Sequence, residues 1–492
     1  MPSVDPAAVA RRVAKRGFNV SPAAASELAA APDTTAAIDA TIEALPDDAV
    51  AITATDLPNE WPTGNDPSSS TGNRQTVPPS RVNAPHETEG GDRTIAVAGD
   101  VTGASTGTGE YGDFITLFRD RYERLSSVLT GRVSHRSARS LANARGGSEV
   151  GMIGMVNEIR STRNGHWLIE LEDTTGAFPT LVLGDAEIAE LVPTLLYDEV
   201  IGVSGRLSDD AGMLFVESIH FPDVPRTNTP STADRPVEAA LISDVHVGSK
   251  EFLTDAWDAF AAWLHTEEAS RIEYLLIAGD MVEGVGVYPG QDSDLAIIDI
   301  YEQYERFSEE LKKVPGDLEV IMIPGNHDAV RLAEPQPGFA DDITEMLAAH
   351  DPTVVANPST VTIESVDILL YHGASLDTVI AEIPHEGVNY ETPHRVMMQL
   401  LKKRHLAPSY GGGIRIAPEE RDYLVIDSIP DVFHAGHVHT MGVGTYNGVR
   451  VVNSGCWQAQ TDYQRRNNLE PTPGRAPILD LSTLDITIRK FV

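Results

Sequence analysis

The second half of the chain alternates short apolar segments with amphipathic ones, and this alternation limits the fold more than any other feature. Apolar runs occur at 239–243, 274–278, 318–323 and 368–371. Segments with apolar residues at helical spacing lie between them, near 255–267, 295–312 and 341–349. Buried strands that alternate with helices predict a layered α/β sandwich. Further strands are expected at 432–435, 444–446 and 449–453, with Asn447-Gly448 as a tight turn, and a last hairpin over 478–481 and 486–491.

Polar residues with metal-binding side chains follow these apolar strands directly. In chain order they are Asp244 and His246, Asp280, Asn326 with His327 and Asp328, His372, and His437 with His439. The carboxyl ends of the strands carry the ligand site in open α/β sheets, so we expect these residues at one edge. Each motif alone is weak, but five motifs at successive strand ends form a strong signal.

The same residue types point to metal ions. Clustering these side chains away from water without a cation would leave buried polar groups uncompensated. Imidazole, carboxylate and amide ligands without a thiolate suit Mn²⁺ best, and Mg²⁺, Fe²⁺ or Zn²⁺ are alternatives. The chain has one cysteine, Cys456, which excludes intrachain disulfides and a cysteine-based zinc motif. We expect Cys456 to be a small buried side chain rather than a reactive thiol.

Residues 149–225 have the character of short strands separated by turns. The strands are expected at 152–159, 167–171, 178–183, 200–207 and 213–219. Asn164-Gly165 predicts a hairpin between the first two, and five such strands predict a small barrel of the OB type. OB barrels often bind single strands through exposed aromatic residues. Aromatic residues are sparse here, so packing against the next domain is at least as good an interpretation.

The N-terminal part is expected to contain a small helical module over 1–48, a disordered linker over 49–112 and a helical connector over 113–148. The linker is predicted from its content of Pro, Gly, Ser and Thr. The connector begins with an amphipathic helix over 113–130. Its arginines either contact DNA or lie on a solvated helix face; they are Arg119, Arg121, Arg124, Arg132, Arg136, Arg139 and Arg145.

The net charge of −36 bears on whether the chain can bind nucleic acid. Nucleic-acid-binding proteins usually present a basic face, so one interpretation is that the chain avoids polyanions. We favour another, that acidic residues solvate the surface in a high-salt cytoplasm, because the composition resembles that of halophilic archaeal proteins. In high salt, counterion release adds little to DNA affinity. No apolar run could span a bilayer and no signal peptide is evident, so we expect a cytoplasmic protein without membrane contact.

The order Asp-x-His, Gly-Asp, Gly-Asn-His-Asp, His and Gly-His-x-His resembles that of the calcineurin-like metallophosphoesterases. The resemblance implies a four-layer α/β/β/α domain over 236–492 with two divalent metal ions. It implies one metal held by Asp244, His246, Asp280 and His439, with Asp280 bridging to a second metal held by Asn326, His372 and His437. Such a pair clamps the attacking and leaving oxygens of a displacement at phosphorus. His327 is the expected general acid or transition-state donor, and Asp328 either orients His327 or caps the next turn.

Longer motifs resemble the small subunits of archaeal family D DNA polymerases over about residues 113–492. They are Val287-Tyr-Pro-Gly-Gln291, Asp299-Ile-Tyr-Glu-Gln-Tyr304, the segment 324–337, Arg404-His-Leu-Ala-Pro-Ser-Tyr-Gly411 with Ala417-Pro-Glu419, and Asn453-Ser-Gly-Cys-Trp-Gln458. This resemblance implies a proofreading 3′→5′ exonuclease that acts on the 3′ end of DNA. It also implies a large partner subunit with the polymerase site, in a heterodimer or higher assembly, and a sliding clamp or primase as a further candidate partner.

The related B-subunits of eukaryotic polymerases have the same barrel and phosphoesterase plan but have lost metal ligands. This sequence keeps every ligand, which favours activity. One departure from the family pattern is Cys456, where a small residue such as threonine is expected.

Other residues carry weaker predictions. Tyr288, Arg331 and Arg404 are candidates for substrate binding, although they could equally line a subunit interface. The basic runs 402–404 and 465–466 are either phosphate contacts or solvated patches. Three functions stay open: a proofreading exonuclease subunit, an architectural or regulatory polymerase subunit with a vestigial metal site, and a stand-alone phosphodiesterase. The barrel and linker count against the third, which needs neither.

Overall fold

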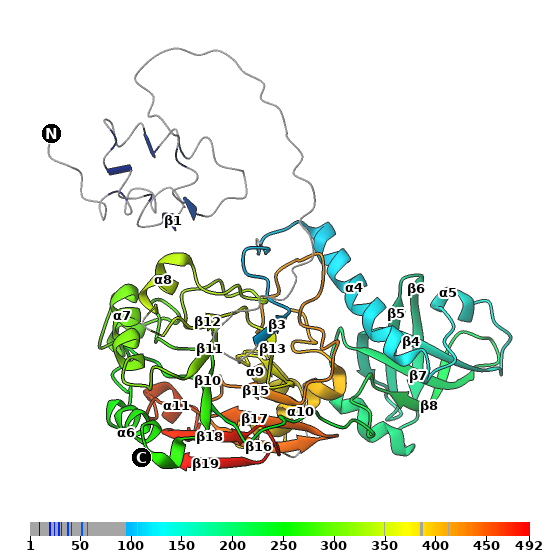
Figure 1. Cartoon of the computed structure of the whole chain (residues 1–492). Helices are drawn as coiled ribbons and strands as arrows, with labels where there is room; N and C mark the ends of the chain where they lie inside the picture. Colours follow the sequence, from blue (N-terminus) through cyan, green and yellow to red (C-terminus); the bar gives the residue numbers. More distant parts are fainter. Residues whose placement is uncertain are drawn as a thin grey trace. The chain divides into compact units, whose positions relative to one another are not determined.

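The computed structural model describes residues 95–492, except 106, 349, 384–386 and 412, together with scattered positions before residue 58. The chain divides into two compact units, Met1–Val82 and Asn83–Val492. Figure 1 shows the course of the chain and the labels of its helices and strands.

The first unit has a short parallel strand pair, β1 (Asn19–Val20) with β2 (Ala51–Ile52), which the sequence analysis does not predict. Apolar side chains at its described helical positions form one buried cluster with Ala31 and Leu57; these are Val9, Ala24, Leu28, Ala29, Ala37 and Ile38. Most of the predicted module over 1–48, and residues 58–94 of the predicted linker, lie outside the described residues.

A first six-stranded sheet has the order β12-β11-β10-β9-β18-β19. Its strands are β9 (Glu238–Ile242), β10 (Ile272–Ala278), β11 (Glu319–Ile323), β12 (Thr353–Val354), β18 (Arg475–Asp480) and β19 (Ile486–Lys490). Neighbours from β9 to β12 pair in parallel, while β18 and β19 form the antiparallel hairpin that ends the chain. The apolar runs predicted at 239–243, 274–278 and 318–323 are confirmed as adjacent buried strands.

A second six-stranded sheet has the order β16-β17-β15-β14-β13-β3. Its strands are β3 (Ile95–Ala98), β13 (Ser359–Ile363), β14 (Val366–Leu370), β15 (Val432–Ala435), β16 (Met441–Tyr446) and β17 (Val449–Ser454). Asn447 and Gly448 have positive φ angles of 45° and 88°, as a tight turn between β16 and β17 requires. This predicted turn is confirmed.

Strand β3 corrects the predicted linker. Residues 95–98 pair antiparallel with β13, from Ile95 opposite Ile363 to Ala98 opposite Thr360. The prediction of a disordered linker over 49–112 is therefore wrong in this segment. The paired residues lie more than 260 positions apart in the sequence. The segment itself has only four apolar or small residues beside a polar stretch, so it does not indicate a distant strand partner.

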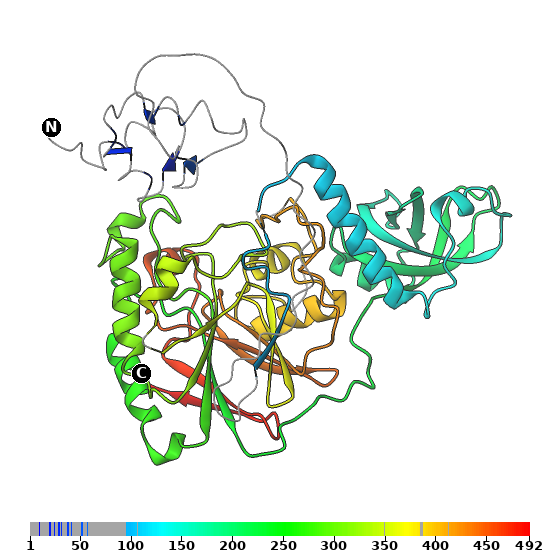
Figure 2. The ribbon, with the colours of Figure 1, turned by 45° about the horizontal axis from the view of Figure 1, so that its top comes forward.

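The two sheets face each other across one apolar core, and each carries helices on its other face (Figures 1 and 2). Strand β9 illustrates the division, because Ala239 and Leu241 point into the core between the sheets. Ala240 and Ile242 point to the helices instead. Side chains alternate faces along a strand, so a run that is apolar throughout is required where both faces are covered.

Helices α6 (Thr254–Leu264), α7 (Ile300–Leu311) and α8 (Asp341–Met346) cover the first sheet. Helices α9 (Leu376–Glu382) and α10 (Pro393–Lys403) cover the second. Single 3₁₀ turns occur at η3 (Glu267–Ala269) and η4 (Gln291–Ser293), and the short helix α11 (Asp462–Arg466) follows β17.

Three helices were predicted beside these two sheets, and their ends differ from the prediction. Helix α7 begins five residues later than expected because the Asp299 side chain accepts hydrogen bonds from the N–H groups of Tyr301 and Glu302 and so caps the helix there. Helices α9, α10 and α11 are not predicted. None of the described helices has the length and the apolar composition that a membrane crossing requires.

Five strands close into a barrel with the order β4-β5-β6-β8-β7, which confirms the predicted five-stranded barrel. They are β4 (Glu149–Ser161), β5 (Trp167–Asp173), β6 (Gly176–Val182), β7 (Val200–Leu207) and β8 (Leu214–His220), with η2 (Glu187–Thr194) between β6 and β7. Strand β4 is long because its first half pairs with β7 and its second half with β5. Gly165, with a φ of 77°, makes the predicted β4–β5 turn.

Helix α4 (Tyr111–Leu129) packs between the barrel and the second sheet, and the short helix α5 (Ala138–Leu141) follows it. The buried face of α4 contains Leu117, Leu125 and Leu129, as an amphipathic helix requires, but it also contains Arg121. The Arg121 guanidinium donates to the Asp422 carboxylate at 2.7 Å and to the Pro408 carbonyl at 2.7 Å. Arg121 is therefore neither a DNA contact nor a solvated residue.

A second buried ion pair ties the barrel to α10. The Lys403 ammonium lies 2.6 Å from a Glu199 carboxylate oxygen and donates to the Thr194 carbonyl at 2.9 Å. The neighbouring Lys402 ammonium lies 4.0 Å from the centre of the Phe221 ring. Among the sparse aromatic residues of segment 149–225, Phe178 and Phe221 are buried, which supports packing for these two rather than binding to bases.

We expect the buried Arg121–Asp422 pair to be important for stability. Removing Asp422 by an Asp422→Ala substitution leaves the Arg121 guanidinium buried without its charge partner, which costs about 3–5 kcal/mol. Denaturant unfolding of the full chain measures this loss. The matched control is Asp427→Ala, because Asp427 pairs with Arg124 at the surface and such a pair contributes about 1 kcal/mol or less. Equal stability of the two variants would contradict the prediction.

Candidate metal centre

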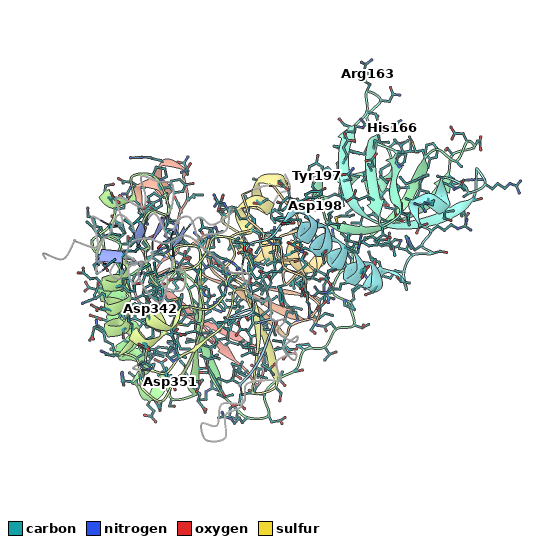
Figure 3. All side chains as sticks on the ribbon, turned by 90° about the horizontal axis from the view of Figure 1, so that it is seen from above. Arg163, His166, Tyr197, Asp198, Asp342 and Asp351 are labelled. Carbon is teal, nitrogen blue, oxygen red and sulfur yellow. The ribbon has the colours of Figure 1, made fainter. Side chains whose placement is uncertain are left out.

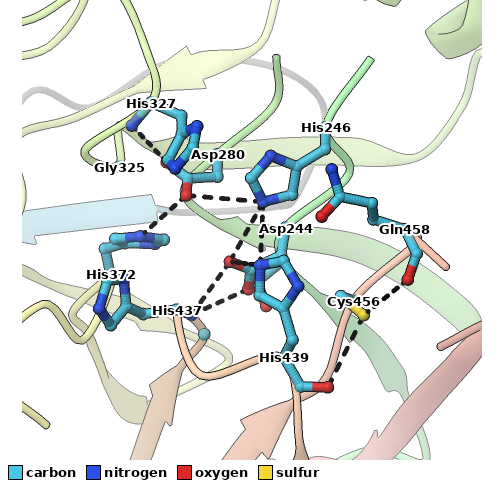
Figure 4. A network of polar contacts seen from close by, with 12 residues as sticks. Asp244, His246, Asp280, Gly325, His327, His372, His437, His439, Cys456 and Gln458 are labelled. Carbon is cyan, nitrogen blue, oxygen red and sulfur yellow. Dashed lines mark hydrogen bonds and ion pairs between the residues drawn. The ribbon is translucent and has the colours of Figure 1, made fainter. Parts of the chain in front are cut away.

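All seven predicted ligands lie at one edge of the two sheets, just beyond the strands that position them. Asp244 and His246 follow β9, Asp280 follows β10, Asn326 follows β11, His372 follows β14, and His437 and His439 follow β15. Both sheets therefore contribute to the cluster, as Figure 4 shows. Asn326 and His437 are half-buried, and the other five side chains are buried.

The backbone is bent into the left-handed region at five of the seven ligands. Positive φ angles of 53° to 72° occur at Asp244, His246, Asp280, His437 and His439. Such angles are uncommon for residues other than glycine and are kept where the surrounding structure enforces them. Two glycines make the close approach possible, because a Cβ atom would lie 2.3 Å from His372 Nδ1 at Gly279 and 2.2 Å from Asp280 Oδ1 at Gly325.

Asp244, His246 and His439 form one group of potential ligands. Their nearest donor atoms all lie within 4.8 Å of one another. His246 Nε2 lies 3.0 Å from His439 Nε2, and His439 Nε2 lies 3.5 Å from Asp244 Oδ1. The peptide N–H of His437 donates to both oxygens of Asp244, at 2.9 and 3.1 Å, which fixes the carboxylate in place.

Asp280 connects this group to a second one. Its Oδ2 atom lies 3.7 Å from His246 Nε2 and 3.2 Å from His372 Nε2, so one carboxylate oxygen faces both groups. Asn326 Oδ1 lies 2.9 Å from His372 Nε2. His437 stands apart in this structure, because its ring Nε2 lies 3.2 Å from Asp377 Oδ2. His327 also falls within ligand distance of His246 and Asp280.

The charges of this cluster fit divalent cations. Burial alone lowers the pKa of the His372 imidazole, but the Asp280 carboxylate outweighs burial and raises that pKa to about 10. Burial alone raises the pKa of Asp280, yet His372 and His327 bring it well below its usual range. In the absence of a cation, protons on histidine must therefore balance the buried carboxylates. Metal ions would take over this role, and the donor set of oxygen and imidazole nitrogen suits them.

Four of the imidazoles also have a polar group close to their second nitrogen. These contacts are His246 Nδ1 to Glu283 Oε2 at 2.9 Å, His372 Nδ1 to Ala278 O at 2.9 Å, His439 Nδ1 to Gln464 Nε2 at 3.0 Å, and His327 Nδ1 to Glu283 O at 2.7 Å. Histidines that bind metal are usually oriented by such outer partners. The sequence analysis misses Glu283, Asp377 and Gln464.

Glu283 is the partner with the most contacts. Its carboxylate faces His246 and accepts a hydrogen bond from Gln458 Nε2 at 2.8 Å, while its carbonyl faces His327. We expect Glu283→Gln to weaken Mn²⁺ binding about 10- to 100-fold, because loss of an outer carboxylate lowers the basicity of its histidine. Isothermal titration calorimetry of the full chain measures this. The exposed Glu391→Gln variant is the matched control, and an unchanged affinity in Glu283→Gln would contradict the prediction.

Asp328 supports the loops of the site from behind. It accepts hydrogen bonds from the N–H groups of Asp280 and Gly325, both at 2.8 Å, and from the Tyr304 hydroxyl at 3.1 Å. Burial, then the charge of Asp280, raises the pKa of Asp328 to about 7. Among the hydrogen bonds of the described residues, none joins the Asp328 side chain to the His327 ring. Of the two predicted roles, loop capping fits and orientation of His327 does not, so Asp328 is a positioning residue.

His327 is half-buried and lies beside His246 and Asp280. Its peptide N–H donates to Asp280 Oδ1 at 2.8 Å, and its Nδ1 faces the Glu283 carbonyl, which leaves Nε2 toward the site. The ring is 4.8 Å from that of His246. Burial is the main cause that lowers the pKa of His327. This geometry fits the predicted proton donor.

The three candidate substrate residues have different surroundings. Tyr288 lies beside the site, with its ring 6.4 Å from that of His327 and its hydroxyl 3.1 Å from Asp294 Oδ2. Arg331 donates to the carbonyls of Ala333 and Pro335 in its own loop, and its guanidinium also pairs with the Glu419 carboxylate at 3.3 Å. Arg404 is buried and its guanidinium donates to the Ile426 carbonyl at 2.7 Å, so in this structure it is not accessible to a substrate.

Two further predictions concern the basic runs and the cysteine. Lys403 and Arg404 are buried in protein contacts, so the phosphate-contact interpretation of residues 402–404 is wrong for these two. Cys456 is buried and its Sγ atom lies 3.3 Å from the Gln458 carbonyl oxygen and 3.7 Å from that of His439. This confirms the expected buried side chain, which packs behind a metal-ligand candidate (Figure 4).

Comparison with known proteins identifies the family that this chain resembles. Residues 239–441 match the family of the B-subunits of DNA polymerases alpha and epsilon. A protein named "DNA polymerase II small subunit" from Halobacterium salinarum is 54% identical over the whole of both chains. Proteins of the same name from Archaeoglobus fulgidus and Pyrococcus furiosus are 44% and 38% identical over 78% and 77% of this chain, and over 78% and 64% of their own lengths.

Proposed function

The chain belongs to the family of DNA polymerase II small subunits, and from this premise we propose that it is the proofreading 3′→5′ exonuclease of a two-subunit DNA polymerase. Membership implies a large catalytic subunit as its partner. The observation that carries the proposal is the metal-ligand cluster, in which every ligand expected from the phosphoesterase pattern stands at one sheet edge. A scaffold without activity would have no need to keep these buried charges.

We also propose that residues 236–492 form a calcineurin-like metallophosphoesterase domain. Two facing sheets with helices on their outer faces agree with the four-layer plan of that fold. The five motifs at the strand ends agree with its order of ligands. Two divalent cations, with Mn²⁺ the first candidate, would supply water activation and charge stabilisation at phosphorus.

In this proposal the residues of the cluster have different roles. Asp244, His246 and His439 would hold one cation, Asn326, His372 and His437 would hold the other, and Asp280 would contribute to both. His437 Nε2 lies 3.2 Å from Asp377 Oδ2 and would exchange this contact for the cation. His327 Nδ1 faces the Glu283 carbonyl, so its Nε2 is free to donate a proton to the leaving 3′-oxygen or a hydrogen bond to the phosphate.

Release of nucleotides from a mismatched 3′ end tests the proposal. The full chain, alone and with its large subunit, is incubated in Mn²⁺ with a primer–template labelled at the 5′ end of the primer. We expect the primer to shorten one nucleotide at a time and EDTA to stop the reaction. Shortening from the 5′ end would refute the polarity, and no shortening in either preparation would refute the activity.

A second candidate function is architectural, and one feature favours it. A cavity of about 650 Å³ lies where α4, the barrel and Tyr410 meet, and its lining includes Phe114, Phe118, Tyr122 and Glu172. Burial and the charge of Asp198 raise the pKa of the Glu172 carboxyl, which a basic group of a partner would relieve. An apolar and basic segment of the large subunit fits this chemistry. Stable assembly without nucleotide release, in the same experiment, would favour this function.

A further inference from the structure

The short helix α11 is attached directly to the metal centre. Its middle residue, Gln464, is buried and places Nε2 3.0 Å from His439 Nδ1. The helix begins in a capping box, in which the Thr461 hydroxyl accepts from the Gln464 N–H and the Gln464 side chain accepts from the Thr461 N–H. Residues that flank Gln464 are therefore held at a fixed position on the rim of the site.

Tyr463 is one of these flanking residues, and 67% of its surface is exposed. The next residue, Gln464, places its amide Nε2 3.0 Å from His439 Nδ1. Tyr463 therefore lies on the side of the centre where His439 lies. An exposed aromatic face at the rim of a phosphoesterase site is suited to stacking on a nucleobase.

Arg466 shares a flank of α11 with Tyr463, since residues three apart are neighbours on a helix. Its side chain is exposed, its charge acts on the nearby Asp462, and no hydrogen bond or ion pair at contact distance joins it to another described residue. The adjacent Arg465 differs, because its guanidinium is bound to the Gln460 carbonyl and to Asp462. In a chain of net charge −36, an arginine without such a contact beside an acidic centre is available to a phosphate.

We propose that Tyr463 and Arg466 form a subsite for single-stranded DNA next to the metal centre. A base of the strand stacks on the Tyr463 ring, and a backbone phosphate contacts Arg466. The subsite takes a single strand because its bases can separate and stack on the ring, whereas bases inside a duplex are stacked on their neighbours on both sides. The inference rests on the proposed exonuclease function. It adds that the strand bound by the subsite is the one whose 3′ end reaches the metal centre. It also favours frayed ends over paired ones.

Binding measurements on the full chain test the subsite separately from hydrolysis. The probe is a single-stranded 12-mer with 2-aminopurine at its 3′ end, used in Ca²⁺ in place of Mn²⁺. We expect Tyr463→Ala to weaken binding about tenfold and to abolish the fluorescence quenching caused by stacking. Tyr463→Phe should keep both, because it keeps the ring. Arg466→Gln should lower the slope of log Kd against log salt by about 0.7.

Matched controls lie on the barrel, where Tyr197 and Arg163 are exposed (Figure 3). Tyr197→Ala and Arg163→Gln should bind as the wild type does. Unchanged binding in Tyr463→Ala, or an equal loss in the two barrel variants, would overturn the subsite. Nucleotide release by the wild type in Mn²⁺ is measured in parallel. Absence of release with the expected binding pattern would refute the exonuclease and leave the subsite, and the reverse pattern would refute the subsite alone.

Discussion

An Asp280→Asn variant is expected to lose nearly all nucleotide release, with kcat lowered about 10³- to 10⁴-fold. One oxygen of Asp280 faces both His246 and His372, so this carboxylate is the group best placed to bridge two cations. Asparagine keeps the shape and can still accept the hydrogen bond from the His327 N–H, but it lacks the charge. Stabilisation of the transition state by a metal pair is worth several kcal/mol, and each 1.36 kcal/mol corresponds to a factor of about ten in rate.

Metal content separates this cause from a general loss of structure. The wild type should bind two Mn²⁺ ions per chain, and Asp280→Asn should bind fewer than two in the same titration. The exposed Asp351→Asn variant, which removes a carboxylate far in sequence from all ligands, should keep both ions and full activity. Two tightly bound ions in Asp280→Asn, together with normal nucleotide release, would refute the assignment of Asp280 as the bridge.

The positions of the ligands could be predicted from the sequence because their signals are local. An apolar run that ends in a polar residue marks the end of a buried strand, and parallel strands end at the same edge. Asp244, Asp280 and His372 follow this rule. The barrel could be predicted for a similar reason, since alternating residues and Asn164-Gly165 define strands and a turn within a few positions.

The outer partners of the histidines could not be predicted in this way. Glu283 is three residues beyond Asp280, but nothing in that spacing says that its side chain turns toward His246. Asp377 and Gln464 lie 60 residues before and 25 residues after the histidines that they contact. Such pairs are fixed by tertiary packing, which a single sequence does not contain.

Burial of charge is the other property that the sequence left open. Arg121, Lys403 and Arg404 stand among other basic residues and look like surface cations, yet all three are buried with partners from distant segments. The pairing of β3 with β13 at the edge of the second sheet is equally non-local. Whether a charged residue on an amphipathic helix is buried can be decided only when the segment that covers it is known.

His327→Gln is expected to lower kcat on DNA about 10²- to 10⁴-fold, the range of general acid catalysis, while both Mn²⁺ ions stay bound. His327 lies within ligand distance of His246 and Asp280, so its role as donor and a role as metal ligand must be distinguished. Glutamine is similar in length and can hydrogen-bond to the Glu283 carbonyl. Loss of one ion in the titration would make His327 a ligand and refute its assignment as the donor.

The leaving group decides what His327 does for the reaction. Departure of a 3′-alkoxide from DNA needs a proton, whereas p-nitrophenolate leaves without one. If His327 is the general acid, the defect of His327→Gln should be large on DNA and close to zero on the p-nitrophenyl ester of thymidine 5′-phosphate. Equal defects on both substrates would instead mean that His327 stabilises charge on the phosphate. Its Nε2 is the nitrogen left free in either case, and only the dependence on the leaving group separates a proton given to the leaving oxygen from a hydrogen bond donated to the phosphate oxygens.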